Sequence, residues 1–280
     1  MKRSGPASLP VRSAPTAPAA NRPRPAFPVR LDTAPAAPIS KPGATSAGAV
    51  RSAAAPVAST TAPRGVGMDS VAVRQAMVRK LQAQGISHPG VLGAMQAVER
   101  HRFVDSALAN QAYEDTSLPI GLGQTISKPS VVARMLELLC QGREGRIGRV
   151  LDIGTGCGYQ AAVLSHLVQE VYSIERLRAL HEKARDNLRA FRLANVHLLF
   201  GDGMPGYPQG APYAGIVAAA GGNDVPQAWI EQLAVGGRLV APVVTDSGQQ
   251  HLIVIERHAH GFRRSVLEPV LFVPLKSGVS

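Results

Sequence analysis

Three acidic residues, Asp152, Glu175 and Asp202, stand at or directly after the ends of short apolar runs in the second half of the chain. Carboxylates accept hydrogen bonds from hydroxyl groups and attract cations. The first acid precedes a turn in which every second residue is glycine: Gly154, Gly156 and Gly158. Because a glycine-rich turn that enters a helix presents backbone N–H groups to a ligand, these residues predict a site for a nucleotide-like cofactor.

The elements around these acids predict the fold class. An apolar run ends at Asp152 and a helical pattern begins at Tyr159, and strand and helix patterns then alternate. This succession is typical of an α/β protein with a doubly wound, mostly parallel Rossmann-like sheet, which binds ligands at the carboxyl ends of its strands. Antiparallel strands are expected at 251–256 and 262–275. The expected parallel strands are 149–153, 170–175, 196–200, 213–219 and 237–244, and the helices between them are 159–168, 177–193 and 226–234.

The spacing of the acids bears on which cofactor binds. Glu175 lies 21 residues after Gly154, where a carboxylate reaches ribose hydroxyls, and this fits NAD as well as an adenosyl methyl donor. However, the third glycine comes one residue early for a dinucleotide turn, and Asp152 would repel a pyrophosphate but attract a sulfonium and an ammonium group. S-adenosylmethionine, with S-adenosylhomocysteine as product, is therefore preferred over NAD. The residues assigned to it are Asp152, Gly154, Thr155, Gly156, Gly158, Tyr159, Glu175, Asp202 and Gly203.

The three acids also have structural interpretations. Asp152 could cap its turn, Glu175 could be a solvated acid at a helix start, and Asp202 could belong to an ordinary Asp-Gly turn.

The region before the expected sheet begins with two amphipathic helical patterns, from Asp69 to Gly85 and over 89–99, which predict a helical cap. Residues 105–128 follow as a long loop without clear periodicity, and a helix starts at Pro129. A loop of that length in a compact domain is usually either functional or disordered, and its mixture of apolar and polar side chains over 118–127 argues against disorder. Its Thr125 and Ser127 stand where it enters the helix, so they are candidates to hold an anion, although Ser127 could simply cap the helix.

The composition separates a tail from a domain. Residues 1–67 are rich in Ala, Pro, Ser, Thr and Arg, and carry nine Lys or Arg against one acid, so most of the net charge of +11 belongs to them. This composition predicts a disordered tail, with a domain over 68–280. An electrostatic contact of the tail with nucleic acid, an acidic partner or a membrane is an alternative, as is a true start at Met68. The remainder is not basic enough to indicate a nucleic-acid-binding domain.

The two cysteines, Cys140 and Cys157, indicate neither a disulfide framework nor a metal site. No apolar run approaches a membrane span and no secretory signal is recognisable. We therefore expect a cytoplasmic protein without a metal, a membrane contact or a specific nucleic-acid partner.

Four segments of the chain form a recognisable set. They are Pro-Ile-Gly-Leu-Gly-Gln-Thr-Ile-Ser-Lys-Pro (119–129), Leu-Asp-Ile-Gly-Thr-Gly-Cys-Gly-Tyr-Gln (151–160), Gly-Asp-Gly (201–203) and Phe-Val-Pro-Leu (272–275). Together they resemble the protein-L-isoaspartate O-methyltransferase family, and the resemblance extends from about Asp69 to Leu275. It implies methyl transfer from S-adenosylmethionine to the α-carboxylate of L-isoaspartyl residues in damaged proteins and peptides. The ester then forms a succinimide, which can reopen to aspartate. A monomer is expected.

The resemblance also implies roles. The serine that matches Ser127 is the family's active-site residue, and the glycine turn with the acids matching Glu175 and Asp202 holds the donor. A carboxylate with a pKa of about 4 is already ionised at neutral pH, so no general base is required. We assign Ser127 and Thr125 to positioning that carboxylate. The residues expected to line the substrate pocket are Leu118, Pro119 and Ile120.

Two departures from the family's pattern are Lys128, where many members carry a neutral amide, and residues 218–224, which lack a proline after the alanines. Lys128 either attracts the substrate carboxylate or faces solvent. Rival interpretations are methylation of a small molecule or RNA, and a donor-binding or interaction protein without catalysis. The Gln-Thr-Ile-Ser segment and the lack of an Asn-Pro-Pro-Tyr motif argue against the first rival.

Overall fold

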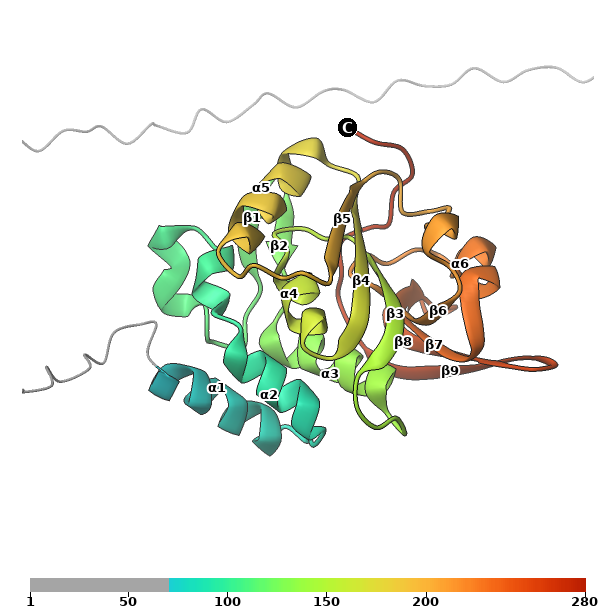
Figure 1. The fold of residues 1–280 in the computed structure, drawn as a ribbon, viewed down its shortest axis with the longest axis horizontal. Coiled ribbons are helices and arrows are strands. Elements are labelled where there is room, and N and C mark those ends of the chain that lie inside the picture. The colour runs from blue at the N-terminus through green and yellow to red at the C-terminus, as the bar shows by residue number, and fades with distance from the viewer. Residues whose placement is uncertain (1–70) are drawn as a thin grey trace, which may run out of the picture. The chain divides into compact units, whose positions relative to one another are not determined.

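The computed structural model describes residues 71–280 (Figure 1). The tail expected at 1–67 lies outside the described residues. The described part begins with the helical cap, made of α1 (Val71–Ala83) and α2 (Pro89–Ala97). Proline suits the first turn of α2 because its missing N–H would have no partner there, and His88 caps the helix by accepting a hydrogen bond from the Val91 amide at 3.3 Å. The cap was predicted and is confirmed.

The domain is built on a seven-stranded sheet in the order β5-β4-β3-β6-β7-β8-β9. The first five strands in this order are parallel to their neighbours, whereas β8 and β9 are antiparallel, which confirms the expected fold class. Because β4 and β6 flank β3 on opposite sides, the order in which successive strands join the sheet reverses at β3 and β6, which is where α/β sheets bind ligands. The strands are β3 (Ile147–Ile153), β4 (Val168–Glu175), β5 (Val196–Phe200), β6 (Tyr213–Ala218), β7 (Leu233–Val244), β8 (Gln250–His258) and β9 (Gly261–Pro269).

Helices cover both faces of the sheet (Figure 1). Successive strand residues point to opposite faces, so Val150 packs in the core beneath α1 to α5, and Leu151 packs in a second core that includes Trp229 of α6. These two cores, one on each face of the sheet, hold in place the strand ends that form the site. The helices after the cap are α3 (Pro129–Cys140), α4 (Tyr159–Ser165), α5 (Arg178–Arg189) and α6 (Gln227–Gln232), with short 3-10 helices η1 (Arg100–Phe103), η2 (Ser106–Gln111) and η3 (Pro208–Gly210).

The expectation of an irregular loop over 105–128 is wrong. This segment contains η2 and an antiparallel hairpin of β1 (Leu118–Gly121) and β2 (Gln124–Ile126). Its strands are too short for a period-two pattern to stand out. The turn depends on left-handed backbone at Gly121, Leu122 and Gly123, where φ is 103°, 52° and 69°.

Several boundaries also differ from expectation. The strand expected over 262–275 ends at Pro269 and is followed by irregular chain, since proline cannot continue the hydrogen-bonded ladder. The helices expected at 159–168 and 177–193 are shorter, and β7 begins four residues before the expected strand at 237–244. None of the described helices is long and apolar enough to cross a membrane.

Candidate active site

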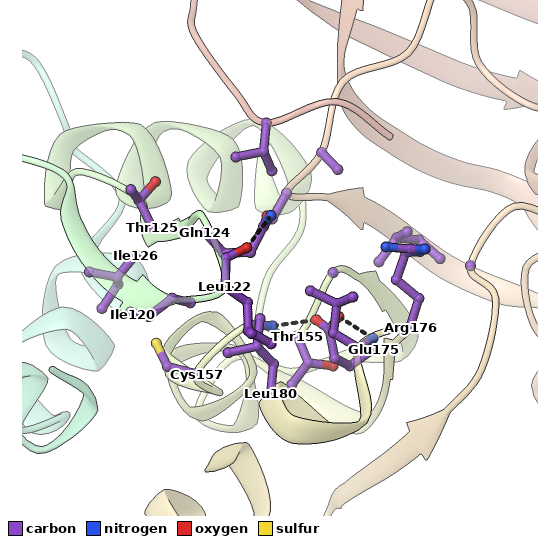
Figure 2. A pocket seen from close by; sticks show the side chains of 18 of the residues that line it. Ile120, Leu122, Gln124, Thr125, Ile126, Thr155, Cys157, Glu175, Arg176 and Leu180 are labelled. Carbon is purple, nitrogen blue, oxygen red and sulfur yellow. Dashed lines mark hydrogen bonds between the residues drawn. The ribbon is translucent and has the colours of Figure 1, made fainter. Parts of the chain in front are cut away.

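A cavity of about 960 Å³ opens at the carboxyl ends of β3 and β4, beside the point where the strand order of the sheet reverses. Figure 2 shows the β1–β2 hairpin, with Leu122 and Gln124, approaching it from one side and Glu175 with Arg176 lying on the other. Chain segments far apart in sequence therefore form a single cavity. Its volume lies within the range of about 300–1,000 Å³ that is usual for small-molecule sites.

The glycine turn predicted from the sequence forms the floor of this cavity. The amides of Gly154 and Thr155 both donate to the Ile174 carbonyl, at 2.9 and 3.1 Å, which ties the turn to β4. The backbone at Gly154, Gly156 and Gly158 is left-handed, with φ of 89°, 56° and 93°, and only glycine adopts such values without strain. Gly154, Thr155, Gly156 and Tyr159 line the cavity, whereas Gly158 packs against α5 instead.

Asp152 lies beneath the turn and is fully buried, so it is not part of the cavity wall. Its Oδ1 accepts a hydrogen bond from Gln160 Nε2 at 2.8 Å and its Oδ2 one from Ser173 Oγ at 2.7 Å. The Ser173 hydroxyl also bonds to Thr155 Oγ1 at 2.7 Å. Burial raises the pKa of Asp152 to about 6, although the hydrogen bonds from Ser173 and Gln160 oppose the shift. Asp152 thus supports the turn from below. It does not line the cavity itself, but it is linked by hydrogen bonds to Gln160 directly and to Thr155 through Ser173, and both of these residues line the cavity.

Glu175, the last residue of β4, lies on the cavity wall. Its Oε2 accepts a hydrogen bond from the Gly156 amide at 2.8 Å and its Oε1 one from the Leu177 amide at 2.9 Å (Figure 2). Each oxygen keeps further lone pairs. The carboxylate is therefore held in one orientation at the position where a ribose is expected.

Asp202 lies behind the cavity wall, next to Gly203, which is part of it. A Cβ atom on Gly203 would stand 2.8 Å from a methyl group of Ile153, so this position requires glycine. The Asp202 carboxylate accepts hydrogen bonds from the amides of Met204 and Gly278, at 2.8 and 2.6 Å. It thereby fixes the segment 276–280, whose Ser280 bonds to Arg176 and reaches the cavity.

On the opposite wall, the hairpin leads through Thr125 to Ser127, and both residues line the cavity. Thr125 is exposed and Ser127 is half-buried. The residue that caps α3 is Lys128, without a side-chain hydrogen bond, so the interpretation of Ser127 as a helix cap is wrong. Lys128 is exposed, which agrees with the expectation that it faces solvent.

Of the three residues expected in the substrate pocket, Ile120 alone lies on the cavity wall. Leu118 shares the buried face of β1 with Ile120 but packs in the core, and Pro119 on the other face is exposed, so neither lines the cavity. The Ile120 carbonyl accepts a hydrogen bond from Lys183 Nζ of α5 at 2.8 Å. This contact attaches the hairpin to the sheet-covering helices.

Several polar residues of the site were missed in the sequence. Ser173 and Gln160, which hold Asp152, each stand in an otherwise apolar run, and this is the signal that could have revealed them. Lys183 lies among many charged residues on α5 and has no comparable signal. Within residues 71–280 no cluster of His, Cys, Asp and Glu is arranged to hold a metal ion.

The sequence model of the protein-L-isoaspartate(D-aspartate) O-methyltransferase (PCMT) family matches residues 72–280. A protein-L-isoaspartate O-methyltransferase of Methylibium petroleiphilum is 56% identical over 269 residues, which cover 93% of this chain and 98% of that protein. One of Burkholderia vietnamiensis is 60% identical over 225 residues, 79% of this chain and 72% of its own.

Solved structures agree with these sequence relatives. A protein-L-isoaspartate O-methyltransferase superposes with a TM-score of 0.67 at 28% identity, covering 74% of this chain and 67% of that one. A Plasmodium falciparum structure described as a putative member, in complex with S-adenosyl-L-homocysteine, shares the fold with a TM-score of 0.63 at 22% identity, over 72% of this chain and 98% of that one. The chain belongs to the protein-L-isoaspartate O-methyltransferase family.

Proposed function

We propose that this protein is a repair enzyme that transfers a methyl group from S-adenosylmethionine to the α-carboxylate of L-isoaspartyl residues in damaged proteins and peptides. The observation that carries the proposal is the single cavity shared by the glycine turn and the hydroxyl-bearing strand end at Thr125 and Ser127. A donor site and an acceptor site must meet within bonding reach for a direct transfer. The methyl ester then cyclises to a succinimide that can reopen to aspartate.

The residues of the donor side fit S-adenosylmethionine. Glu175 is held where it accepts hydrogen bonds from ribose hydroxyls, and its carboxylate, with that of Asp152 beneath the glycine turn, suits a positively charged ligand better than a pyrophosphate. Gly203, which lines the cavity, packs closely on Ile153 at the wall that Asp202 supports. Asp152 acts from beneath, through Gln160 and Thr155. When bound, the donor supplies a methyl group on a sulfonium sulfur.

The acceptor side needs to position a nucleophile that is already ionised, because a carboxylate loses its proton well below neutral pH. The Ser127 hydroxyl donates a hydrogen bond to one carboxylate oxygen and Thr125 assists it, so that the other oxygen faces the methyl group. The apolar wall formed by Ile120, Ile126 and Leu180 excludes water from this meeting point. No proton has to be removed, and no His, Cys or acid is needed as a base.

The decisive experiment is the transfer of tritiated methyl groups to an isoaspartyl peptide and to its normal aspartyl twin. We expect labelling of the isoaspartyl peptide alone. Equal labelling of both peptides would indicate a methyltransferase with another acceptor, and donor binding without any labelling would indicate a binding protein without catalysis. Either result would reject the proposal.

We also propose that residues 68–280 carry the whole activity and that the enzyme works as a monomer in the cytoplasm, without a nucleic-acid or membrane partner. A chain shortened to begin at Met68 should keep kcat and KM on short peptides within about twofold of the full chain, since every residue assigned to the donor or the acceptor follows Met68. Loss of activity would assign the tail a part in the reaction. Light scattering and cell fractionation test the oligomeric state and the location.

A further inference from the structure

Arg100 is an arginine with no exposed surface, in the 3-10 helix η1 between the cap and the hairpin. Among the described residues it makes no salt bridge with a carboxylate. Burial lowers the pKa of its guanidinium, which nevertheless stays charged because the ordinary pKa of arginine is above 12. Burying a charge without an ion-pair partner destabilises a fold, so the contacts that Arg100 makes in return are of interest.

These contacts are with the backbone of the segment that carries the acceptor residues. Nε donates to the Ala112 carbonyl at 2.7 Å, and Nη2 donates to the Ser127 carbonyl at 2.8 Å. A longer contact of 3.5 Å joins Nη2 to the Thr116 carbonyl. One rigid, planar group thus binds both ends of the segment Ala112–Ser127, including the residue whose hydroxyl is assigned to the substrate.

The face of the same guanidinium lies on the donor side. Its central carbon is 4.7 Å from the centre of the Tyr159 ring, a cation–π contact. Tyr159 begins α4 directly after the glycine turn and lines the cavity. Nη1 is buried and has no hydrogen-bond partner among the described residues, so the position of the guanidinium leaves one of its donor nitrogens unpaired.

We infer that Arg100 is a positioning residue, which sets the distance between the Ser127 hydroxyl and the glycine turn by contacting both. The inference rests on the proposed function, because it concerns the alignment of acceptor and donor. Arginine suits the role since its donors are fixed in one plane and that plane can stack on a ring. A lysine ammonium keeps the charge but cannot bind two separate carbonyls and an aromatic face in the same fixed geometry.

The test compares Arg100→Lys with a matched control, Arg238→Lys. Arg238 Nη1 also donates to two backbone carbonyls, those of Leu138 and Gln141 at 2.7 and 2.9 Å, and it does not line the cavity. At saturating donor and peptide, we expect R100K to lower kcat about 30-fold, since small misplacements at a site cost up to about 100-fold. The donor Kd of R100K, from calorimetry, should stay within about twofold, and R238K should keep the wild-type kcat while losing thermal stability.

A kcat of R100K equal to that of R238K, at the same fraction of folded protein, would overturn the inference and leave Arg100 a purely structural role. So would a failure of both R100K and Arg100→Gln to fold, because the side chain would then serve the fold itself. Absence of labelling by the wild-type protein would instead refute the proposed function. Equal turnover of wild type and R100K would refute only the role of Arg100.

Discussion

The two walls of the cavity are held by charges of opposite sign. On the donor side, Glu175 on the wall and Asp202 behind it accept hydrogen bonds from backbone amides, and Asp152 beneath the glycine turn accepts them from side chains. On the acceptor side, Lys183 and Arg100 donate hydrogen bonds to backbone carbonyls. The donor side thus has carboxylates in its supporting structure, next to Arg176 and Arg178 of the cavity wall, and the acceptor side has positive charge behind the residues proposed to bind an anion.

The two walls also differ in exposure. The acids at 152 and 175 are buried and their oxygens are already engaged, whereas Thr125 is exposed and Leu122 at the hairpin turn is 59% exposed. This difference suits the reaction, because the donor is one small molecule of fixed shape but the acceptor is a residue within many protein chains. The same cavity therefore combines a preorganised donor site with an acceptor site that is accessible to solvent.

The largest expected effect concerns Asp152, the carboxylate buried beneath the glycine turn on the donor side. The folded-state pKa of Asp152, about 6, lies above the ordinary value of 3.8. Between these values the folded protein holds a proton that the unfolded chain has lost, so this residue's contribution to stability falls as the pH rises. A shift of this size corresponds to about 3 kcal/mol. In urea unfolding, wild type should lose about that much relative to Asp152→Asn between pH 4 and pH 7.

Asp246→Asn, which changes an exposed acid, is the control for this experiment. The same difference between wild type and D152N at both pH values would show that Asp152 does not change its charge in this range.

The next effect tests the acceptor wall. Ser127→Ala should lower kcat about 100-fold, the loss of one hydrogen bond to a charged group, or about 2.7 kcal/mol. The donor Kd should not change, because Ser127 is assigned to the acceptor alone. Ser130→Ala is the control, since Ser130 lies one residue into the same helix and away from the cavity. Weaker donor binding by S127A, with kcat preserved, would contradict the assignment of Ser127 to the acceptor wall.

A smaller and complementary effect is expected on the donor wall. Glu175→Gln should raise the donor Kd about 30-fold, or about 2 kcal/mol, because an amide cannot replace both charged acceptor oxygens. At saturating donor, kcat should remain near that of wild type. Glu170→Gln changes an exposed acid of the same strand and provides the comparison in isothermal titration. If E175Q affected kcat alone, the assignment of Glu175 to the donor would fail.

The smallest effect concerns the attachment of the hairpin. Lys183→Met removes the hydrogen bond to the Ile120 carbonyl and should raise the KM for isoaspartyl peptides about fivefold, or about 1 kcal/mol. Peptide titrations at saturating donor measure this value. Lys80→Met, which breaks the exposed pair with Glu114 on the cap, is the matched control. A KM of K183M equal to that of K80M would show that the hairpin needs no attachment to α5.

The sequence revealed the parallel sheet and most of the donor wall, because buried strands and a glycine turn are local patterns. The position of Ser127 and Thr125 before a helix start marked them as candidates to hold an anion, but their role as acceptor residues came only from the family resemblance. The hairpin was missed because its strands are three and four residues long. Arg100 and Lys183 could not be recognised, since each acts on a carbonyl that is distant in sequence and the partner carbonyl belongs to the backbone, which every residue has.

The attachment of the acceptor segment to the backbone has a consequence for protein engineering. Lys183 and Arg100 bind the carbonyls of Ile120, Ala112 and Ser127, and a carbonyl survives any substitution at its residue. The exposed positions 119 and 122 can therefore be randomised without removing the bonds that hold the hairpin. A library at these two positions, screened against peptides with different neighbours of the isoaspartate, offers a route to variants with altered sequence preference on an unchanged donor site.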